Sequence, residues 1–549
     1  MDYNYLAELL FPNVTATPDD MEQKYPVRNL REGAVVSRLA PSPTGYVHLG
    51  NILQAMTSER ICHLSDGVYF LRVEDTDQKR EVPGAVSVLL DSLAHYNIHF
   101  DEGATVEGDS GSYGPYRQRS RAEIYHVFAK KLVAEGKAYP CFCTEDELTA
   151  MREAQESEKV DFGYYGKWAT WRDRPIEDIK AKLDAGEGWV LRFRSTGSVS
   201  NKFKFTDLIK GVIDVSENDK DMVLLKSDGI PTYHFAHAVD DHLMRTTHVV
   251  RGDEWLASLP FHIQLFAALG FKLPKYAHIG PLMIMDGSSK RKISKRKDPE
   301  FGLIYYAQNG FPINSVREYL LTVLNSNFED WRRANPDLPL EKFPFSLKKM
   351  NPAGSLFDSA KLSDVSKNVV SKMTADEVYE GLYKWAAEFD PEYAAELDAD
   401  PDYARAIVSI GRGGKKPRKD YGTWVELKAY TELFYDKYFA VVDAYPETAD
   451  KADVKATLEA FLECYDAADD QNVWFDKIKA IADRLGYASD MKEYKAEPEK
   501  FRGSVADISM FLRVAVTGKL NSPDMFTVMG IIGEDRVRAR INSMINSLR

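Results

Sequence analysis

Val35-Val36-Ser37-Arg38-Leu39-Ala40-Pro41-Ser42-Pro43-Thr44-Gly45-Tyr46-Val47-His48-Leu49-Gly50 is the stretch that decides the fold of this chain. An apolar run enters a rigid turn of Pro, Ser, Thr and Gly, and a histidine and a glycine then open an amphipathic helix. Residues 68–73 form a second apolar run of strand character. The sequence therefore predicts a strand–helix–strand unit of the kind that builds doubly wound nucleotide-binding folds.

The start of this helix is the first candidate site. Free N–H groups and the positive end of a helix dipole favour a phosphate. Gly50 has no Cβ and leaves room for a flat base or ribose, while His48 can give the phosphate a hydrogen bond or a positive charge. A Pro-rich turn into an ordinary helix with a capping histidine explains the same residues, so this stretch alone leaves both interpretations open.

A cationic segment far down the chain supports the nucleotide interpretation. Residues 290–297, Lys-Arg-Lys-Ile-Ser-Lys-Arg-Lys, follow a Gly/Ser turn and an apolar stretch at 279–285, which we expect to be the last strand of the sheet. A lysine loop at that edge can fold over a nucleotide and stabilise charge on a transferring phosphoryl or adenylyl group. A solvated charged face is the alternative.

The two motifs together resemble a known family. P-S-P-T-G-Y-V-H-L-G (residues 41–50), followed by K-I-S-K-R (292–296), resembles the two signature sequences of class I aminoacyl-tRNA synthetases in the form carried by glutamyl-tRNA synthetases. R-V-E-D-T-D at 72–77, D-G-I-P-T-Y at 228–233 and R-G-D-E at 251–254 also match that family. The resemblance runs from about residue 34 to the C-terminus and leaves out the first 33 residues.

The composition fits a soluble globular protein of several domains. The chain has 549 residues, of which 44% are hydrophobic and four are cysteine, and its net charge is −13. We expect a cytoplasmic protein without membrane contact, because the chain has few cysteines, no apolar run that could span a bilayer and no signal peptide at its start. The acidic balance disfavours non-specific DNA binding, but local basic patches at 290–297 and 412–419 permit one specific RNA.

The predicted fold class is α/β. The resemblance implies a Rossmann-like class I catalytic domain with an inserted acceptor-binding module, a helical stem and an all-helical C-terminal anticodon-binding region. Past residue 375 we find no run of short alternating strands, which favours the helical end of bacterial-type glutamyl enzymes over the β-barrel end of glutaminyl enzymes. The expected divisions are an N-terminal extension (1–33), the first catalytic half (34–115), the inserted module (116–226), the second catalytic half (227–285), the stem-contact region with the K-I-S-K-R loop (286–375) and the anticodon-binding region (376–549).

The resemblance also implies roles for individual residues. The catalytic set is His48, Gly50, Lys292 and Lys295. The ATP-binding set is Pro43, Gly45, His48, Gly50, Glu254, Trp255, Lys292, Ser294, Lys295 and Arg296. The glutamate-binding set is Arg38, Ala40, Ser42, Glu74, Tyr233, His237 and Arg251, in which Glu74 takes the α-ammonium group and Arg251 the γ-carboxylate. The tRNA-binding set is Asp77, Arg412, Lys415, Lys416, Arg418 and Lys419.

Two departures from the family bear on these roles. Many relatives carry asparagine where this chain has His237, so we expect the pocket to differ in its fine shape. Some relatives hold zinc with a Cys-x-Cys pair and a later Cys-x-His or Cys-x-Tyr pair. Here Cys141 and Cys143 are followed by residues 164–171 without cysteine or histidine, so we predict no structural zinc. ATP with Mg²⁺ is the expected cofactor set.

The activity implied is ATP-dependent ligation of L-glutamate to tRNA(Glu) through glutamyl-adenylate, with no obligate protein partner. One alternative is a non-discriminating enzyme that also glutamylates tRNA(Gln). Another, from a different class, is a non-catalytic tRNA-binding paralogue, which retention of His48, Gly50 and the loop lysines disfavours. A glutaminyl enzyme is disfavoured by the P-S-P-T-G motif and by the helical C-terminal part. A truncated tRNA-modifying relative is disfavoured because the anticodon-binding half is present. A small-molecule nucleotidyltransferase would not need the roughly 250 residues beyond the lysine loop.

Overall fold

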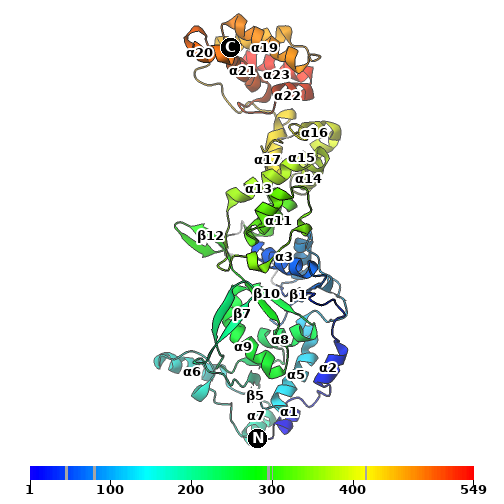
Figure 1. Cartoon of the computed structure of the whole chain (residues 1–549), viewed down its shortest axis with the longest axis vertical. Helices are drawn as coiled ribbons and strands as arrows, with labels where there is room; N and C mark the ends of the chain where they lie inside the picture. The colour runs from blue at the N-terminus through cyan, green and yellow to red at the C-terminus, as the bar shows by residue number, and fades with distance from the viewer. Residues whose placement is uncertain (44–46, 78–81, 294–296, 299–300, 415–416, 549) are drawn as a thin grey trace. The chain divides into compact units, whose positions relative to one another are not determined.

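The computed structural model describes residues 1–43, 47–77, 82–293, 297–298, 301–414 and 417–548 (Figure 1). It divides into two compact units. Unit 1 holds Met1–Leu303 and Arg317–Asp358, and unit 2 holds Ile304–Val316 and Ser359–Arg549. The division falls within helices α10 (Leu303–Gln308) and α11 (Ile313–Leu324).

Unit 1 is built on parallel strands. β1 (Val36–Leu39), β2 (Val68–Leu71) and β3 (Glu102–Ala104) are parallel neighbours, and β4 (Asp109–Ser110) adds an antiparallel edge. β10 (His248–Gly252) and β11 (Lys275–Ile279) form a second parallel pair. The Thr247 amide donates to the Val36 carbonyl at 2.9 Å, so β10 begins beside β1. The carboxyl ends of β1, β2 and β10 therefore meet at one edge, which is where open α/β sheets bind ligands.

Helices cover this sheet as the apolar spacing predicts. α3 (Leu49–His63) joins β1 to β2, contacts both and buries Leu49, Ile52, Leu53 and Met56. Arg60 interrupts the apolar positions of α3 but is also buried, because its Nη2 donates to the carbonyls of Glu341 at 2.5 Å and Phe343 at 3.3 Å. The other helices of this part of unit 1 are α4 (Ala85–His95), α5 (Ala122–Ala134), α8 (Tyr233–Leu243) and α9 (Leu259–Leu269).

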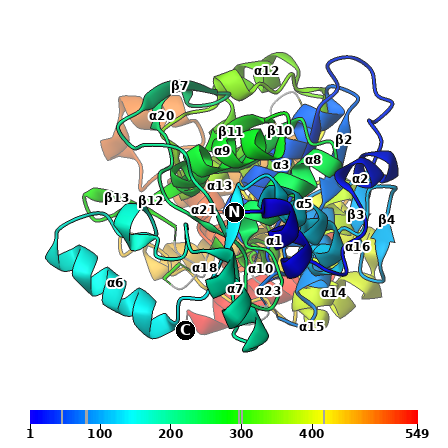
Figure 2. The same cartoon turned by 90° about the horizontal axis from the view of Figure 1, so that it is seen from below.

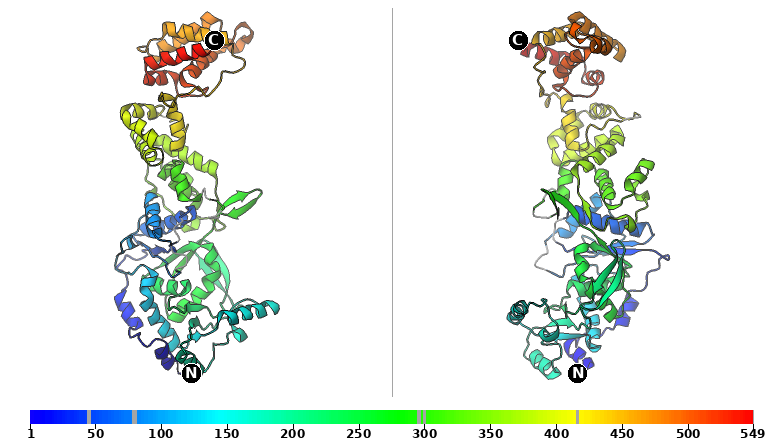
Figure 3. Two further views of the ribbon diagram at one scale, coloured as in Figure 1. Left: turned by 180° about the vertical axis from the view of Figure 1, so that it is seen from behind. Right: turned by 60° about the vertical axis from the view of Figure 1, so that its left-hand side comes forward.

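The sequence predicts that the apolar stretch 279–285 is the last strand of the sheet, and this prediction is wrong. β11 ends at Ile279, and β12 (Leu282–Asp286) belongs to a separate sheet with β13 (Ser289–Lys292) and β14 (Ser355–Leu356). The β12–β13 hairpin is the green pair of arrows that stands out at the side in Figure 3. The Gly280-Pro281 dipeptide breaks the run, since proline has no N–H for a ladder and ends a central strand. The cationic segment consequently begins on a hairpin beyond the sheet.

Residues between the two halves of the sheet form additional elements. β5 (Ala138–Cys141), β6 (Val190–Phe193) and β9 (Val223–Leu225) make an antiparallel sheet, accompanied by α6 (Glu145–Ser157) and α7 (Ile176–Asp184). β7 (Lys202–Asp207) and β8 (Gly211–Ser216) form a hairpin. Val215 of this hairpin packs with Val249, Leu259 and Tyr276, so the hairpin is fixed against β10 and β11.

The N-terminal extension lies on unit 1. α1 (Tyr3–Leu10) and α2 (Pro18–Lys24) contact α5 (Figure 2). Glu22 accepts from Arg245 at 2.7 Å, and Tyr25 is buried with its hydroxyl donating to the Gly114 carbonyl at 3.0 Å. These contacts tie the extension to both halves of the sheet's supporting structure.

Unit 2 is helical throughout its described residues and shares one apolar core that runs from Val370 to Ile545. α12 (Phe328–Ala334), which follows α11 in the chain, belongs to unit 1. The helices of unit 2 beyond α10 and α11 are α13 (Ser359–Lys372), α14 (Ala375–Phe389), α15 (Pro391–Ala399), α16 (Pro401–Val408), α17 (Trp424–Thr431), α18 (Lys451–Cys464), α19 (Gln471–Leu485), α20 (Met491–Ala496), α21 (Val505–Thr517), α22 (Met525–Ile532) and α23 (Glu534–Ser547). None of the helices in the described part of the chain has the length and apolar character needed to cross a lipid bilayer.

Gly354 should be essential to the base of the β12–β13 hairpin. Its φ is +88°, and an added Cβ would lie 2.3 Å from the Pro281 carbonyl oxygen. We expect Gly354→Ala to lower the free energy of unfolding in urea by at least about 1 kcal/mol. Gly188→Ala is the matched control, because a Cβ there meets nothing within 4 Å. Equal stability of the two variants would contradict this reading of the close approach.

Candidate active site

The carboxyl edge of the sheet brings together the residues that the sequence assigned to a glutamate pocket. Arg38 lies on β1, Glu74 follows β2, Arg251 lies on β10 and Tyr233 begins α8. Burial raises the pKa of Tyr233, Glu74 raises it further, and Arg251 and Arg38 oppose the shift, so these four side chains lie within electrostatic reach of each other. Ala40 and Ser42 follow β1 at the same edge.

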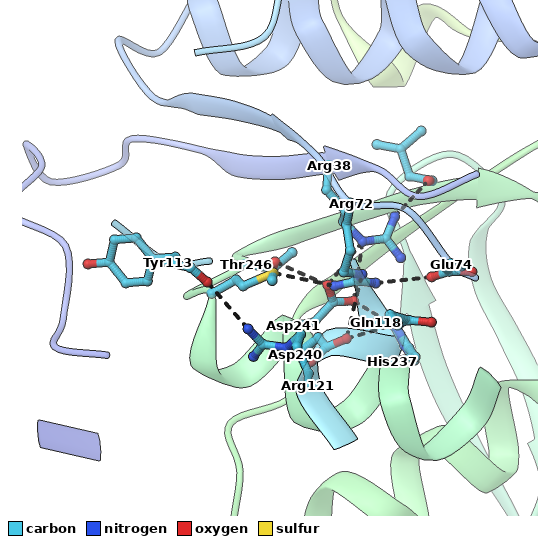
Figure 4. Close-up of polar contacts among 12 residues, drawn as sticks. Arg38, Arg72, Glu74, Tyr113, Gln118, Arg121, His237, Asp240, Asp241 and Thr246 are labelled. Atoms are coloured by element: carbon cyan, nitrogen blue, oxygen red, sulfur yellow. Dashed lines mark hydrogen bonds and ion pairs between the residues drawn. The ribbon is translucent and has the colours of Figure 1, made fainter. Parts of the chain in front are cut away.

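A buried ionic network forms the floor of this site (Figure 4). Asp241 lies 3.1 Å from Arg38 Nε and 2.6 Å from Arg72 Nη1. Arg72 Nη2 lies 3.2 Å from Glu74, and Arg121 Nε lies 2.6 Å from Asp240. Asp240 also accepts hydrogen bonds from the Gln118 amide at 3.0 Å and the Tyr125 hydroxyl at 2.8 Å. Three guanidinium groups thus face three carboxyl groups.

Burial and pairing act in opposite directions on these acids. Burial alone would raise the pKa of Asp241, but Arg38 and Arg72 outweigh it and hold that pKa well below its usual range. At Glu74 burial prevails over Arg72 and Arg38 and raises the pKa to about 7. Asp241 is therefore the fixed anion of the network, whereas Glu74 can be ionised or neutral near pH 7.

Arg38, which the resemblance places in the glutamate-binding set, is held by two protein partners. Its Nε donates to both oxygens of Asp241, at 3.1 and 3.2 Å, and its Nη1 donates to the Val250 carbonyl at 3.4 Å. Arg38 is only 2% exposed and its Nε is held by Asp241, so it supports this network, while its contact with glutamate stays a prediction.

Arg251 has different surroundings, although it is also buried at 3% exposure. Its Nε donates to His278 Nε2 at 3.0 Å, its Nη1 to His262 Nδ1 at 3.1 Å and its Nη2 to the Trp255 carbonyl at 3.4 Å. The guanidinium carbon lies 4.7 Å from the centre of the Tyr276 ring. Among the residues that the structure describes, no carboxylate lies within ion-pair distance of Arg251.

The histidines around Arg251 are neutral. Burial lowers the pKa of His262 well below its usual range and, with help from Arg251, lowers that of His234 to about 4. Because arginine only donates, His262 Nδ1 accepts from Arg251, and its Nε2 then donates to His234 Nδ1 at 2.9 Å. Burial also lowers the pKa of His237 to about 3 despite Asp241, whose Oδ2 lies 2.6 Å from His237 Nδ1. His237 Nε2 accepts from the Tyr276 hydroxyl at 2.9 Å.

The predicted nucleotide site lies at the start of α3. His48 is the N-cap residue, and its amide donates to Asn51 Oδ1 at 3.1 Å. A Cβ at Gly50 would lie 2.8 Å from the His48 imidazole, so the glycine leaves space for this histidine ring. His48 also forms an isolated β-bridge with Gly302, and the Leu303 amide donates to the Val47 carbonyl at 3.4 Å. The chain beyond the lysine loop therefore returns to the histidine–glycine turn.

The residues assigned to ATP lie around this turn and the end of β10. Lys292 Nζ lies 3.1 Å from Glu254 Oε2, and both side chains are more than half exposed. The Trp255 ring lies 4.2 Å from that of Tyr233, which joins the ATP set to the glutamate set. The Pro43 carbonyl accepts from the Val82 amide at 2.9 Å. Gly45, Ser294, Lys295 and Arg296 lie outside the described residues.

The Cys141 and Cys143 thiols do not form a zinc site of the usual composition. Each sulfur lies 3.5 Å from the Tyr164 hydroxyl, which also accepts from the Trp171 amide at 2.9 Å. Two thiols and a phenol do not supply the four Cys or His ligands of a closed structural site. Among the described residues, no group of three or more His, Cys, Asp or Glu could hold a metal ion.

The predicted tRNA residues are dispersed. Asp77 is half-buried beyond β2. Arg412 points inward, because its guanidinium donates to the carbonyls of Val408 at 2.7 Å, Val370 at 2.6 Å and Met373 at 3.0 Å. Arg412 therefore caps helix ends, and its contact with tRNA stays a prediction. Arg418, paired with Asp420, and Lys419 are exposed, while Lys415 and Lys416 lie outside the described residues.

The sequence alone gave no role to several buried polar residues of this site: Arg72, Arg121, Asp207, Asp240, Asp241, His262 and His278. The available signal was polar residues inside otherwise apolar elements, such as Asp240-Asp241 in α8 and His278 in β11. Nothing in their spacing indicates which partner each one meets across the sheet.

The carboxyl edge of the parallel sheet leads into the start of α3, with His48 and Gly50, and the chain that follows the lysine segment returns to this turn at Gly302. This arrangement is that of a class I tRNA synthetase. Residues 34–327 match the family of class I tRNA synthetases (E and Q), catalytic domain, and residues 416–545 match the anticodon binding domain family. The chain is 50% identical over 546 residues to a glutamate–tRNA ligase of Acetivibrio thermocellus, covering 99% of this chain and 100% of that relative. The corresponding protein of Sorangium cellulosum is 47% identical over 565 residues, with 97% and 99% covered.

A solved structure supports the same family. The glutamate tRNA ligase of Elizabethkingia meningosepticum, in complex with its amino acid, superposes with a TM-score of 0.76 at 25% identity, covering 94% of this chain and 100% of that one. This chain belongs to the glutamate–tRNA ligase family.

Asp241→Asn should be strongly destabilising. The change leaves Arg38 and Arg72 buried with too little compensating charge, so we expect a loss of about 3–5 kcal/mol in the free energy of unfolding. Because the pKa of Asp241 is depressed in the folded state, this loss should be full above about pH 4 and should shrink as the pH falls further. Urea unfolding of Asp330→Asn, whose ion pair with Arg333 is mostly exposed, is the control and should differ little from wild type. A small effect at both positions would contradict the proposed network.

Proposed function

We propose that this chain ligates L-glutamate to tRNA(Glu) in an ATP-dependent reaction that passes through glutamyl-adenylate. The observation that carries the proposal is the contrast between two kinds of buried arginine. Arg38, Arg72 and Arg121 are matched by carboxylates, whereas Arg251 contacts neutral histidines and a carbonyl. A buried cation without a protein anion favours an anionic ligand, and glutamate's γ-carboxylate has the charge and bidentate shape that a guanidinium binds.

The opposite end of glutamate requires an anion. Glu74 lies at the end of β2 within reach of Tyr233, and we assign it to the α-ammonium group. Its carboxylate is only partly offset by Arg72 at 3.2 Å, which leaves capacity for a second cation. With Arg251 at the γ-carboxylate and Glu74 at the ammonium, the α-carboxylate is left to face the helix start that carries His48.

Catalysis in this arrangement is positioning together with stabilisation of charge at phosphorus. The α-carboxylate attacks the α-phosphate of ATP and pyrophosphate leaves; the 2′-hydroxyl of the tRNA's terminal adenosine then takes the glutamyl group. We assign His48 and Lys295 to the transition-state phosphate and Lys292 to the nucleotide, with Ser294 and Arg296 in the same loop. The bridge between His48 and Gly302 supports this assignment, because it brings the chain after the lysine segment back to the start of α3.

We propose that Mg²⁺ accompanies ATP, since this ion prefers phosphate and water oxygens with one or two carboxylates. The exposed Glu254 carboxylate, beside Lys292, is the candidate closest to the nucleotide residues. For the RNA we propose Asp77 near the acceptor end, with Lys415, Lys416, Arg418 and Lys419 as phosphate contacts.

Substitution of Arg251 should separate the two substrates. We expect Arg251→Ala to raise the KM for glutamate by about thirtyfold or more in aminoacylation of tRNA(Glu), because it removes the partner of a buried charge, while the KM for ATP changes little. Arg333→Ala, an exposed arginine of α12, is the control and should behave as wild type. Similar losses for both substrates would refute the assignment. The same assay with tRNA(Gln) and with glutamine distinguishes a discriminating enzyme from a non-discriminating one.

Glutamate binding should depend on pH through Glu74. Because the pKa of Glu74 is about 7 and the ammonium requires the carboxylate, binding should tighten from pH 6 to 8 and weaken towards tenfold per unit below pH 7. His234 and His237 titrate well below this window, at about 4 and 3, so they do not contribute. Calorimetry of wild type, Glu74→Gln and the ligand glutarate, which lacks the ammonium, tests the assignment. Glu74→Gln should bind weakly with a flat profile, and an unchanged slope in that variant would contradict it.

A further inference from the structure

We propose that Asp207 is a positioning residue for substrate recognition: by fixing the tautomer of His278, it fixes the orientation of Arg251. The inference rests on the proposed role of Arg251 as the γ-carboxylate ligand. Asp207 ends β7 in the hairpin that is inserted between the two halves of the sheet, so the inserted hairpin takes part in selecting the amino acid.

The contacts form a continuous line of three buried side chains. Asp207 Oδ2 lies 2.6 Å from His278 Nδ1, and His278 Nε2 accepts from Arg251 Nε at 3.0 Å. Asp207 is 2% exposed, His278 is 0% exposed and Arg251 is 3% exposed. Water therefore has little access to any of the three, and each must find its partners within the protein.

Asp207 is itself rigidly held. Its Oδ1 accepts from the backbone amides of Ile209 at 2.9 Å and Lys210 at 2.8 Å, in the turn between β7 and β8. Burial would raise the pKa of Asp207, but its bonds to His278 and to these amides outweigh burial and keep the pKa below the ordinary value. The turn thus presents a fixed, ionised carboxylate oxygen to His278.

The charge state of His278 then follows. Burial lowers its pKa against the pull of Asp207, so the imidazole is neutral and carries one proton. An ionised carboxylate 2.6 Å from Nδ1 places that proton on Nδ1 and leaves a lone pair on Nε2. That lone pair is the acceptor that Arg251 Nε requires.

With Nε held by His278 and Nη1 held by His262, the guanidinium plane is fixed over the Tyr276 ring. Nη2 makes the longest of the three contacts, 3.4 Å to the Trp255 carbonyl. Orientation by acceptors behind a ligand-binding group is the usual function of such outer partners, and their loss weakens binding without removing the binding group itself.

The packing explains why the acid comes from the inserted hairpin. Val215 of β8 shares an apolar core with Val249, Leu259 and Tyr276, so the hairpin is fixed against the strands that carry Arg251 and His278. The His278 amide also donates to Asp207, at 3.2 Å to Oδ2, which joins β11 to the hairpin at this point.

Asp207→Asn tests the tautomer directly. If the asparagine Oδ1 keeps the two turn amides, its NH₂ group faces His278 Nδ1, which must then accept, and the proton moves to Nε2. Two donors then oppose each other at Arg251 Nε. We expect the Kd for L-glutamate to rise at least about tenfold, the preference for glutamate over glutamine to fall, and ATP binding to stay unchanged.

His278→Phe keeps a ring of similar shape and removes both nitrogens. Because Asp207 acts through His278, the double variant Asp207→Asn/His278→Phe should bind glutamate no more weakly than whichever single variant binds it more weakly. The two substitutions should therefore show a large coupling energy in a double-mutant cycle. His278→Gln offers Arg251 an amide oxygen, which accepts a hydrogen bond without depending on the position of an imidazole proton. This variant should bind glutamate more tightly than His278→Phe. Calorimetry gives both ligands' affinities, and circular dichroism with urea unfolding confirms that each variant is folded.

Asp221→Asn is the matched control, because Asp221 is also a buried carboxylate of the inserted segment, but it bonds Tyr139 and Arg172 instead. It should lose stability without changing the ratio of glutamate to glutamine affinity. Equal effects of Asp207→Asn and Asp221→Asn on that ratio, or additive effects of Asp207→Asn and His278→Phe, would overturn the inference. If Asp207→Asn does not fold, the comparison of His278→Gln with His278→Phe still decides it, since equal affinities would overturn it.

Wild type and Arg251→Ala separate this inference from the proposed function. Wild-type protein that neither binds nor transfers glutamate would refute the function itself. Strong loss in Arg251→Ala with wild-type binding in Asp207→Asn would refute only the positioning role.

Discussion

The compensation of buried positive charge is the constraint on which the active site depends. Three arginines beneath the carboxyl edge of the sheet are balanced by Asp240, Asp241 and Glu74, and the network is nearly closed to solvent. Burying a charge is costly unless it is paired, so these arginines are bound to their acids and support the fold. Arg251 lies outside this balance. Its partners are neutral, which leaves its charge to be matched by a ligand.

Keeping those partners neutral depends on burial. A protonated histidine beside Arg251 would repel it and would also lose the lone pair that the guanidinium needs. Burial lowers the pKa of His234, His237, His262 and His278, so the cluster accepts hydrogen bonds at any pH near neutrality. Glu74 is the exception in this pocket, since its pKa of about 7 makes the ammonium end sensitive to pH while the carboxylate end is not. His237 is one of these neutral histidines.

The sequence predicted the fold class, the strand–helix–strand unit and the helical C-terminal part, because apolar periodicity and capping residues are local. It also placed Arg251, Glu74 and Tyr233 at the ends of predicted strands or at the start of a helix, and the structure brings them to one edge of the sheet. It could not predict that Arg38 and Arg412 are bound to protein acceptors, since such contacts depend on partners such as Asp241, which lies 203 positions from Arg38. The prediction of a strand at 279–285 was wrong because the Gly280-Pro281 dipeptide separates β11 from β12. His278 and Asp207 were missed because their pairing is a property of the packed hairpin.

The most direct test of this account is a crystal structure of the protein with L-glutamate bound. We expect the γ-carboxylate to lie within hydrogen-bond distance of the Arg251 guanidinium and the α-ammonium to lie beside Glu74, with Arg38 still bound to Asp241. A γ-carboxylate bound instead by Arg38, with Asp241 displaced from it, would contradict the division between supporting and ligand-binding arginines.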